Sequence, residues 1–161
     1  MNPLNAIPNL AVLIYHQPDG PGTLPEGFEF FWGGYQLRHK PGGYTDGMSS
    51  PQFTHVLSAA DPYGWALPAA VPHDGGYHDD IEKWTVDGWK KITLTKPECD
   101  QMFFDLLNLI AAGDVQKQSL AKLFYEAVHI GGLAAFNQGR ERAALRDAQA
   151  DPDYPKTEVR A

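Results

Sequence analysis

The chain has 161 residues, a formal net charge of -7 at neutral pH and 43% hydrophobic residues. That hydrophobic share is ordinary for a folded protein, so global disorder is excluded, and the length suffices for one domain with its own core. The acidic balance argues against a nucleic-acid partner and against attraction to an anionic membrane, because both need clustered lysine and arginine.

The chain has a single cysteine, Cys99, which excludes an intramolecular disulfide and fits a reducing compartment or a virion. No apolar stretch of about 18 residues occurs, so we expect no transmembrane segment. A basic start followed by an apolar run is also missing, so we expect no signal peptide.

Residues 1–40 combine short apolar runs with glycine and proline, which predicts a β-rich region. The runs 28–32 and 35–39 flank the pair Gly33-Gly34. A Gly-Gly pair tolerates the positive φ angles that tight hairpin turns require. We therefore expect an N-terminal β-hairpin region whose apolar face covers the helices.

Residues 41–64 contain many glycine, proline, aspartate and serine residues and have no helical period. We interpret this stretch as an ordered loop, and a loop of this length inside a compact domain is typical of a functional segment. Asp46 lies within it, followed by Gly47 and Met48.

Residues 65–149 are predicted to form a core of three helices. The first is expected over about 65–83, although two prolines weaken its pattern. Pro68 suits a first turn, whereas Pro72 is expected either to kink the helix or to mark its true start. In the second case His73 would lie in the opening turn.

The second and third helices have clearer signals, and residues 84–94 between the first and second helices read as a polar connection or small hairpin. Thr95 and Glu98 form a capping-box pattern that begins the second helix, and Gly113 is a good stop. Asp114 is expected to cap one long last helix. An amphipathic stripe of the second helix faces the core; its members are Cys99, Met102, Phe103, Leu106, Leu107 and Ile110.

Together these patterns predict an α+β fold with a mainly α core of three helices and an N-terminal hairpin region. Residues 1–149 are expected to form a single globular domain, and residues 150–161 a loose tail. The helices that carry His73 and Asp100 should run antiparallel.

Asp100 borders the apolar stripe of the second helix, where a carboxylate is costly unless it is paired. His73 is its candidate partner. An aspartate on one imidazole nitrogen fixes the tautomer and leaves the other nitrogen free to take a proton from water. Asp74 projects to another side of its helix, and its oxygens, with those of Asp46, suit a hard cation such as calcium.

The three aspartates also have an alternative, purely structural interpretation. In it, Asp46 caps a turn, Asp74 caps the helix, and Asp100 is a first-turn charge near a helix N-terminus. Zinc is another alternative, although residues five apart do not share one helix face as the i,i+4 pair of zinc proteases does. The candidate zinc ligands are His55, His73, Asp74 and His78.

Other polar residues have simpler interpretations. Ser49 and Ser50 are expected to be turn residues, because no G-x-S-x-G elbow surrounds them. Cys99 is predicted to be buried rather than reactive. Glu126 and His129 are predicted at the surface of the last helix.

Three segments resemble the prokaryotic and fungal secreted phospholipase A2 family in order and approximate spacing. They are D-G-M-S-S-P from Asp46, H-D-G-G-Y from His73, and the helix with Asp100 and Phe103. The resemblance implies that His73 activates water and that Asp100 orients it. It also implies calcium ligands at Asp46, Asp74 and loop carbonyl oxygens near Gly47 and Met48.

The pattern T-D-G-x-S-x-P, then H-D, then A/C-D-x-x-F also resembles an uncharacterised family of phage and bacterial proteins. This resemblance implies a phage or prophage origin, with the host cytoplasm or the phage virion as location. Met48 stands where the phospholipase family has a cysteine, and Gly75-Gly76 replace bulkier residues, which we expect to loosen the helix.

Two functions follow as hypotheses. The first is a calcium-dependent ester hydrolase of phospholipase A2 type, with phospholipid or another ester as substrate and a His73–Asp100 dyad. The second is a non-catalytic phage structural or host-interaction protein that retains the scaffold and binds a virion or host protein.

Overall fold

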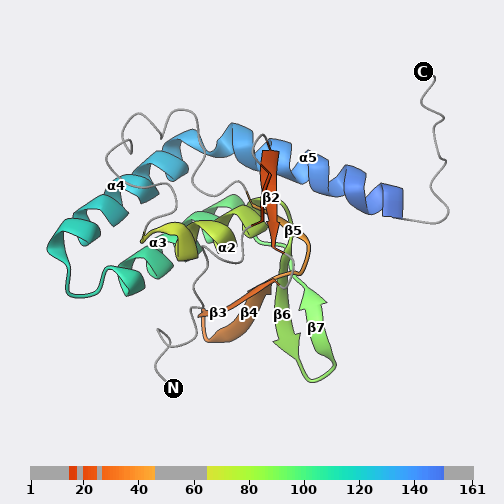
Figure 1. The fold of residues 1–161 in the computed structure, drawn as a ribbon, viewed down its shortest axis with the longest axis horizontal. Coiled ribbons are helices and arrows are strands. Elements are labelled where there is room, and N and C mark those ends of the chain that lie inside the picture. Colours follow the sequence, from red (N-terminus) through yellow and green to blue (C-terminus); the bar gives the residue numbers. More distant parts are fainter. Residues whose placement is uncertain (1–14, 18–19, 25–26, 46–64, 151–161) are drawn as a thin grey trace.

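The computed structural model describes residues 15–17, 20–24, 27–45 and 65–150. Within these ranges the protein has an α+β fold of two antiparallel sheets and four helices (Figure 1). The strands are β1 (Tyr15–Gln17), β2 (Gly20–Leu24), β3 (Phe28–Trp32), β4 (Tyr35–His39), β5 (Gly43–Thr45), β6 (Ile81–Thr85) and β7 (Gly88–Lys91). The helices are α2 (Leu67–Tyr77), α3 (Lys96–Ile110), α4 (Val115–Gly131) and α5 (Leu133–Ala150).

The larger sheet has the strand order β3-β4-β6-β7. The predicted hairpin is confirmed, because β3 pairs with β4 from Phe28 opposite His39 to Trp32 opposite Tyr35. Both turn glycines have positive φ, 60° at Gly33 and 80° at Gly34, as the tight turn requires. A second hairpin joins β6 to β7, as the small-hairpin interpretation of residues 84–94 predicted, although β6 begins earlier, at Ile81. The smaller sheet has the order β1-β2-β5.

Helix α2 begins near its predicted start but ends earlier than predicted. It begins at Leu67 with Pro68 in its first turn, so Pro72 lies inside the helix and His73 lies beyond the opening turn. Nearly all of α2 is buried, and this packing outweighs the poor helix propensity of proline. The predicted extension to residue 83 is wrong, because Asp79 has a φ of 60° and β6 starts at Ile81.

The second helix has the predicted start. Thr95 and Glu98 form the capping box of α3, and Gly113 has a φ of 84° just after the helix. The Asp114 side chain accepts hydrogen bonds from two backbone N–H groups of the first turn of α4, as an N-cap should.

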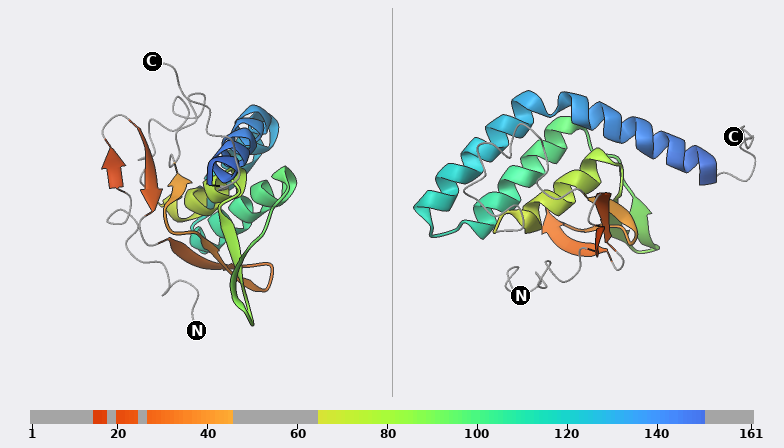
Figure 2. Two further views of the ribbon diagram at one scale, coloured as in Figure 1. Left: turned by 90° about the vertical axis from the view of Figure 1, so that its right-hand side faces the viewer. Right: turned by 45° about the horizontal axis from the view of Figure 1, so that its top comes forward.

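The predicted long last helix is two helices, so the described residues contain four helices rather than three. Gly132 separates α4 from α5, and Figure 2 shows the two meeting at an angle, with α2 and α3 side by side beneath them. A Cβ at Gly132 would collide with the Tyr77 hydroxyl and with the Val128 carbonyl. The chain therefore approaches α2 closely where it bends.

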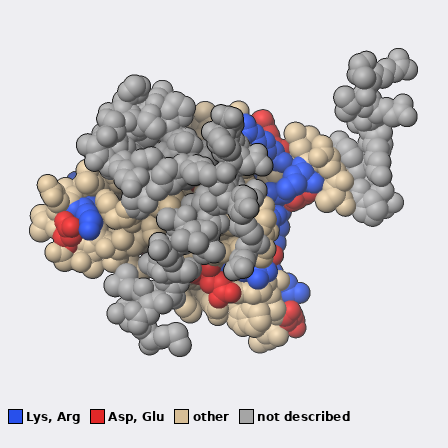
Figure 3. Space-filling view, in the orientation of Figure 1, with Lys and Arg blue, Asp and Glu red and all other residues tan. Residues whose placement is uncertain are grey.

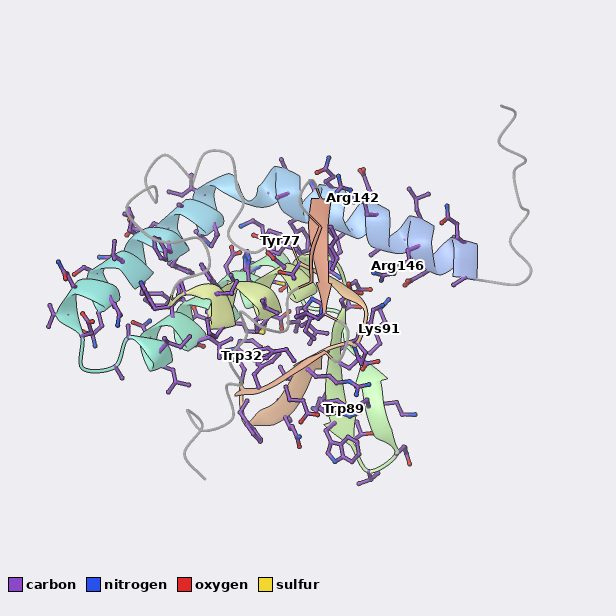
Figure 4. The ribbon with its side chains drawn as sticks, in the orientation of Figure 1. Trp32, Tyr77, Trp89, Lys91, Arg142 and Arg146 are labelled. Carbon is purple, nitrogen blue, oxygen red and sulfur yellow. The ribbon has the colours of Figure 1, made fainter. Side chains whose placement is uncertain are left out.

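Helix α5 is largely polar; it packs through Phe136 and Ala143 and makes several ion pairs with the rest of the protein. Arg140 pairs with Asp79, and Lys91 of β7 lies 2.7 Å from Asp79 and 2.6 Å from Asp147. Arg146 pairs with the buried Asp80 at 2.7 Å. Lys91 and Arg146 lie at the same junction of β7 with α5 (Figure 4), where Figure 3 shows lysine and arginine gathered.

Side chains from α2, α3 and the larger sheet form one hydrophobic core, to which Phe124 of α4 contributes. None of the helices in the described residues combines the length and hydrophobicity needed to cross a bilayer.

Candidate functional site

Helices α2 and α3 run antiparallel and bring His73 and Asp100 together, as predicted. The His73 ring contacts Phe103, with centroids 4.9 Å apart, whereas Gly76, further along α2, lies against Cys99. Between these contacts, His73 Nε2 lies 3.4 Å from Asp100 Oδ1. Asp100 is fully buried, and His73 is 7% exposed.

Asp100 is the centre of a polar cluster that the sequence did not fully reveal. The Tyr77 hydroxyl donates to Asp100 Oδ1 at 2.8 Å, and Lys96 Nζ donates to Oδ2 at 2.6 Å. His129 Nδ1 lies 3.3 Å from Oδ2, although its side chain is half exposed, as its predicted surface position requires. Lys96 also donates to the carbonyl oxygens of Val128 and His129, each at 3.0 Å.

Helical spacing could have identified two of these neighbours. Tyr77 follows His73 by four residues, and Lys96 precedes Asp100 by four, so each shares a helix face with its partner. His129 has no such signal, because it comes from a different helix.

These contacts keep Asp100 ionised. Burial by itself raises the pKa of the Asp100 carboxyl, but hydrogen bonds from His73, Lys96 and Tyr77 outweigh it and lower that pKa to about 2. The carboxylate is therefore a permanent acceptor at neutral pH.

His73 is kept neutral. Burial lowers the pKa of its imidazole, and the hydrogen bond with Asp100 opposes this effect only in part. Its second nitrogen, Nδ1, lies 3.9 Å from Asp74 Oδ1, which is beyond hydrogen-bond distance. With Nε2 turned to a carboxylate, Nδ1 is the nitrogen that can accept a proton.

Asp74 lies at the edge of this cluster. The Thr45 hydroxyl donates to Asp74 Oδ2 at 2.7 Å, so strand β5 ends beside Asp74. Strand β5 lies inside the predicted functional loop of residues 41–64, so that part of the loop prediction is wrong, and residues 46–64 lie outside the described residues. The other members of the predicted calcium site lie outside the described residues: Asp46, Gly47 and Met48.

Across residues 15–17, 20–24, 27–45 and 65–150, no group of three or more His, Cys, Asp or Glu side chains is arranged to hold a metal ion. His78, a candidate zinc ligand, contacts the Tyr44 ring, with centroids 4.1 Å apart and the ring planes tilted by 39°. His73, another candidate zinc ligand, faces Asp100 instead. His55, Ser49 and Ser50 lie outside the described residues.

The glycines after Asp74 have a different effect from the one predicted. A Cβ at Gly75 would overlap the buried ring of His39, and a Cβ at Gly76 would lie 2.6 Å from Cys99 Sγ. Gly75 and Gly76 thus let β4 and α3 approach α2 closely, and this packing holds the helix rather than loosening it.

Cys99 is buried, as predicted. Burial raises the pKa of its thiol to about 12, so the thiolate is negligible at neutral pH.

The comparisons with known proteins leave the family open. No family model, no curated protein and no solved structure matches this chain. The resemblances to the phospholipase A2 and phage families therefore stay predictions, and the site described above rests on its own geometry.

Proposed function

We propose that this protein is an ester hydrolase in which His73 is the general base and Asp100 orients it. The observation that carries the proposal is the placement of one neutral imidazole between two carboxylates. Its Nε2 faces Asp100 at 3.4 Å, and its Nδ1 faces Asp74 at 3.9 Å.

The reaction follows from this placement. With the proton held on Nε2 by Asp100, the Nδ1 lone pair accepts a proton from a water molecule. The hydroxide oxygen then bonds to the ester carbonyl carbon. As the carbon–oxygen bond to the leaving group breaks, His73 returns the proton to the departing alkoxide, and the products are a carboxylic acid and an alcohol.

Calcium is part of this proposal. The carboxylates of Asp74 and Asp46, with carbonyl oxygens near Gly47 and Met48, would hold it, since calcium prefers oxygen ligands. The fit is supported by Thr45, whose contact with Asp74 brings the chain to that carboxylate one residue before Asp46. Such an ion would polarise the ester carbonyl.

The proposed substrate is a phospholipid or another ester, in a protein of phage or prophage origin with a phospholipase A2-like helical core. The antiparallel α2–α3 pair with His73 and Asp100 facing each other is the feature that supports such a core.

The test is fatty-acid release from phosphatidylcholine vesicles, with calcium and with chelator. We expect calcium-dependent release by the wild type and a loss of about 10²- to 10⁴-fold in His73→Ala, the usual contribution of a general base. Asp105→Asn is the control, because Asp105 lies on α3 with Asp100 but bonds to Trp32 and Gln101 outside the cluster. Wild-type release no faster than that of His73→Ala contradicts the proposal.

A second function is favoured by one specific observation. Asp100 and Lys96 together join α2, α3 and the end of α4, through Tyr77, His73 and the α4 carbonyls. A cluster that serves only to join helices fits a non-catalytic phage structural or host-interaction protein. In that case Asp100→Asn would destabilise the fold although the wild type hydrolyses no ester.

A further inference from the structure

The face of the larger sheet directed away from the core carries a row of large flat side chains. Phe31 of β3 is paired with Gln36 of β4, and Trp84 of β6 is paired with Trp89 of β7. The pairing of β4 with β6 puts Leu37 opposite Lys83, so one step further Gln36 lies beside Trp84. Because directly paired residues share a face, the four side chains form one row across the sheet.

Two aromatic members of this row, Phe31 and Trp84, are open to solvent, and the third, Trp89, is partly buried. Phe31 is 56% exposed and Trp84 is 50% exposed. The Trp84 and Trp89 rings meet edge to face with centroids 5.2 Å apart, and the Arg38 guanidinium lies 4.4 Å from the Trp89 centroid. These contacts fix the rings in place without covering Trp84. Figure 4 shows Trp89 on the β6–β7 hairpin, away from the helices.

Next to this aromatic row runs a charged row. Its members are Glu29, Arg38, Glu82 and Lys91, two acidic and two basic side chains. Arg38 pairs with Glu82 at 2.6 Å, and Gln36 donates to Glu29 at 3.1 Å. On the opposite side the aromatic row is bordered by the two hairpin turns. The apolar strip is therefore one side chain wide and electrically balanced at its border.

We propose that this row binds a linear, uncharged glycan. The negative faces of aromatic rings attract the C–H groups that cover the flat faces of a pyranose ring. Phe31 and Trp84 lie two strands apart, about 9.5 Å, so one extended chain of sugars meets both rings. Between them the Gln36 amide supplies a donor and an acceptor for hydroxyl groups, and Arg38 supplies further donors.

The charged row disfavours other occupants. A second copy or another protein packed face to face on the sheet would also cover the exposed charges of Glu29 and Lys91, and removing these charges from water costs free energy. A nucleic acid needs excess positive charge, whereas the chain carries a net charge of -7 and the charged row is balanced. A glycan one ring wide lies on the aromatic row, meets the charged row only at Arg38, and leaves the exposed Glu29 and Lys91 in water.

The experiment is a titration of the full chain with cellohexaose and with chitohexaose. Binding is monitored by tryptophan fluorescence and by calorimetry. Trp84→Ala and Phe31→Ala remove one ring each. Tyr35→Ala is the matched control, because Tyr35 is 52% exposed on the same sheet but points to the other face, over Lys83. Melting temperatures of all variants verify that each is folded.

We expect saturable binding of at least one oligosaccharide by the wild type. Each of Trp84→Ala and Phe31→Ala should weaken it by about tenfold or more, the effect of losing one stacking contact, and Tyr35→Ala should leave it unchanged. Failure of the wild type to bind either oligosaccharide overturns the proposal. So does an equal loss in Tyr35→Ala, or a concentration-dependent dimer that Trp84→Ala abolishes.

Discussion

The Tyr77 hydroxyl on α2 donates a 2.8 Å hydrogen bond to Asp100 on α3, and it shares the acceptor oxygen Oδ1 with His73. Burial and the charge of Asp100 raise the pKa of Tyr77, so the phenol keeps its proton. The two side chains thus form a fixed link between the helices on which the candidate base and its orienting carboxylate lie.

Removal of this link should destabilise the protein. Tyr77→Phe keeps the ring but leaves Asp100 without one donor, and hydrogen bonds to charged groups contribute about 1.5–3 kcal/mol. We expect a loss of that size in urea denaturation. Tyr35→Phe, at an exposed position, is the control and should change stability by less than about 0.5 kcal/mol. Equal effects of both variants would show that the Tyr77 link is unimportant.

Acid should remove the contribution of Asp100. The folded pKa of Asp100, about 2, lies below its ordinary value of 3.8, so its ionised form stabilises the fold above pH 3.8. That contribution, about 2 kcal/mol, is lost as the pH falls from 3.8 through 2. Urea denaturation of the wild type and of Asp100→Asn across this range checks it, because the variant should lack this component of the pH dependence.

Three histidines should also lower the stability of the fold on acidification, and they do so at a higher pH than Asp100 does. Burial lowers the folded pKa of His78 to about 4, and burial also lowers the pKa values of His39 and His73. The unfolded chain therefore binds more protons below pH 6.5, and stability should fall as the pH drops from 6.5 through 4. NMR titration of the imidazole C–H signals measures the pKa of each ring in the folded protein. Midpoints near 6.5 for all three rings would contradict it.

Gly76 and Gly131 offer a matched pair of substitutions. Gly76→Ala puts a methyl group 2.6 Å from Cys99 Sγ and should destabilise the fold by about 1–3 kcal/mol. Gly131→Ala, at the end of α4 with nothing within 4 Å, should stabilise it by up to about 1 kcal/mol. Chemical denaturation measures the change in the free energy of unfolding for both variants. Changes of the same sign would show that Gly76 does not mediate close packing.

Cys99 should be unreactive until the protein unfolds. Its side chain is fully buried, and burial raises the pKa of its thiol to about 12. Labelling with a disulfide reagent at neutral pH should proceed only at the unfolding rate and should accelerate in urea. Rapid labelling of the folded chain would mean that α2 and α3 separate locally.

Local signals explain the parts of the fold that were predicted correctly. The Gly33-Gly34 turn and the Thr95 capping box are determined by neighbouring residues, so β3–β4 and the start of α3 are visible in the sequence. For α2, the predicted end was too late and the place of Pro72 stayed open, because both depend on packing. Pro72 is tolerated inside it only because α3 and the sheet enclose the helix.

The candidate site was predictable to a similar extent. His73 and Asp100 could be paired because a carboxylate beside an apolar stripe needs a partner. The contact of His129 with Asp100 was not predictable, since it depends on how α4 crosses α3 and the side chain itself is half exposed.

Three successive residues in the last turn of α2 are contacted from different sides: Gly75 by β4, Gly76 by α3, and Tyr77 by Gly132 between α4 and α5 and by Gly139 of α5. The amide hydrogens of this turn can reach solvent only if these elements separate together, so we expect them among the slowest to exchange in the protein. The geometry around His73 then persists for as long as the whole domain stays folded, and a fragment limited to α2 and α3 would not assemble it.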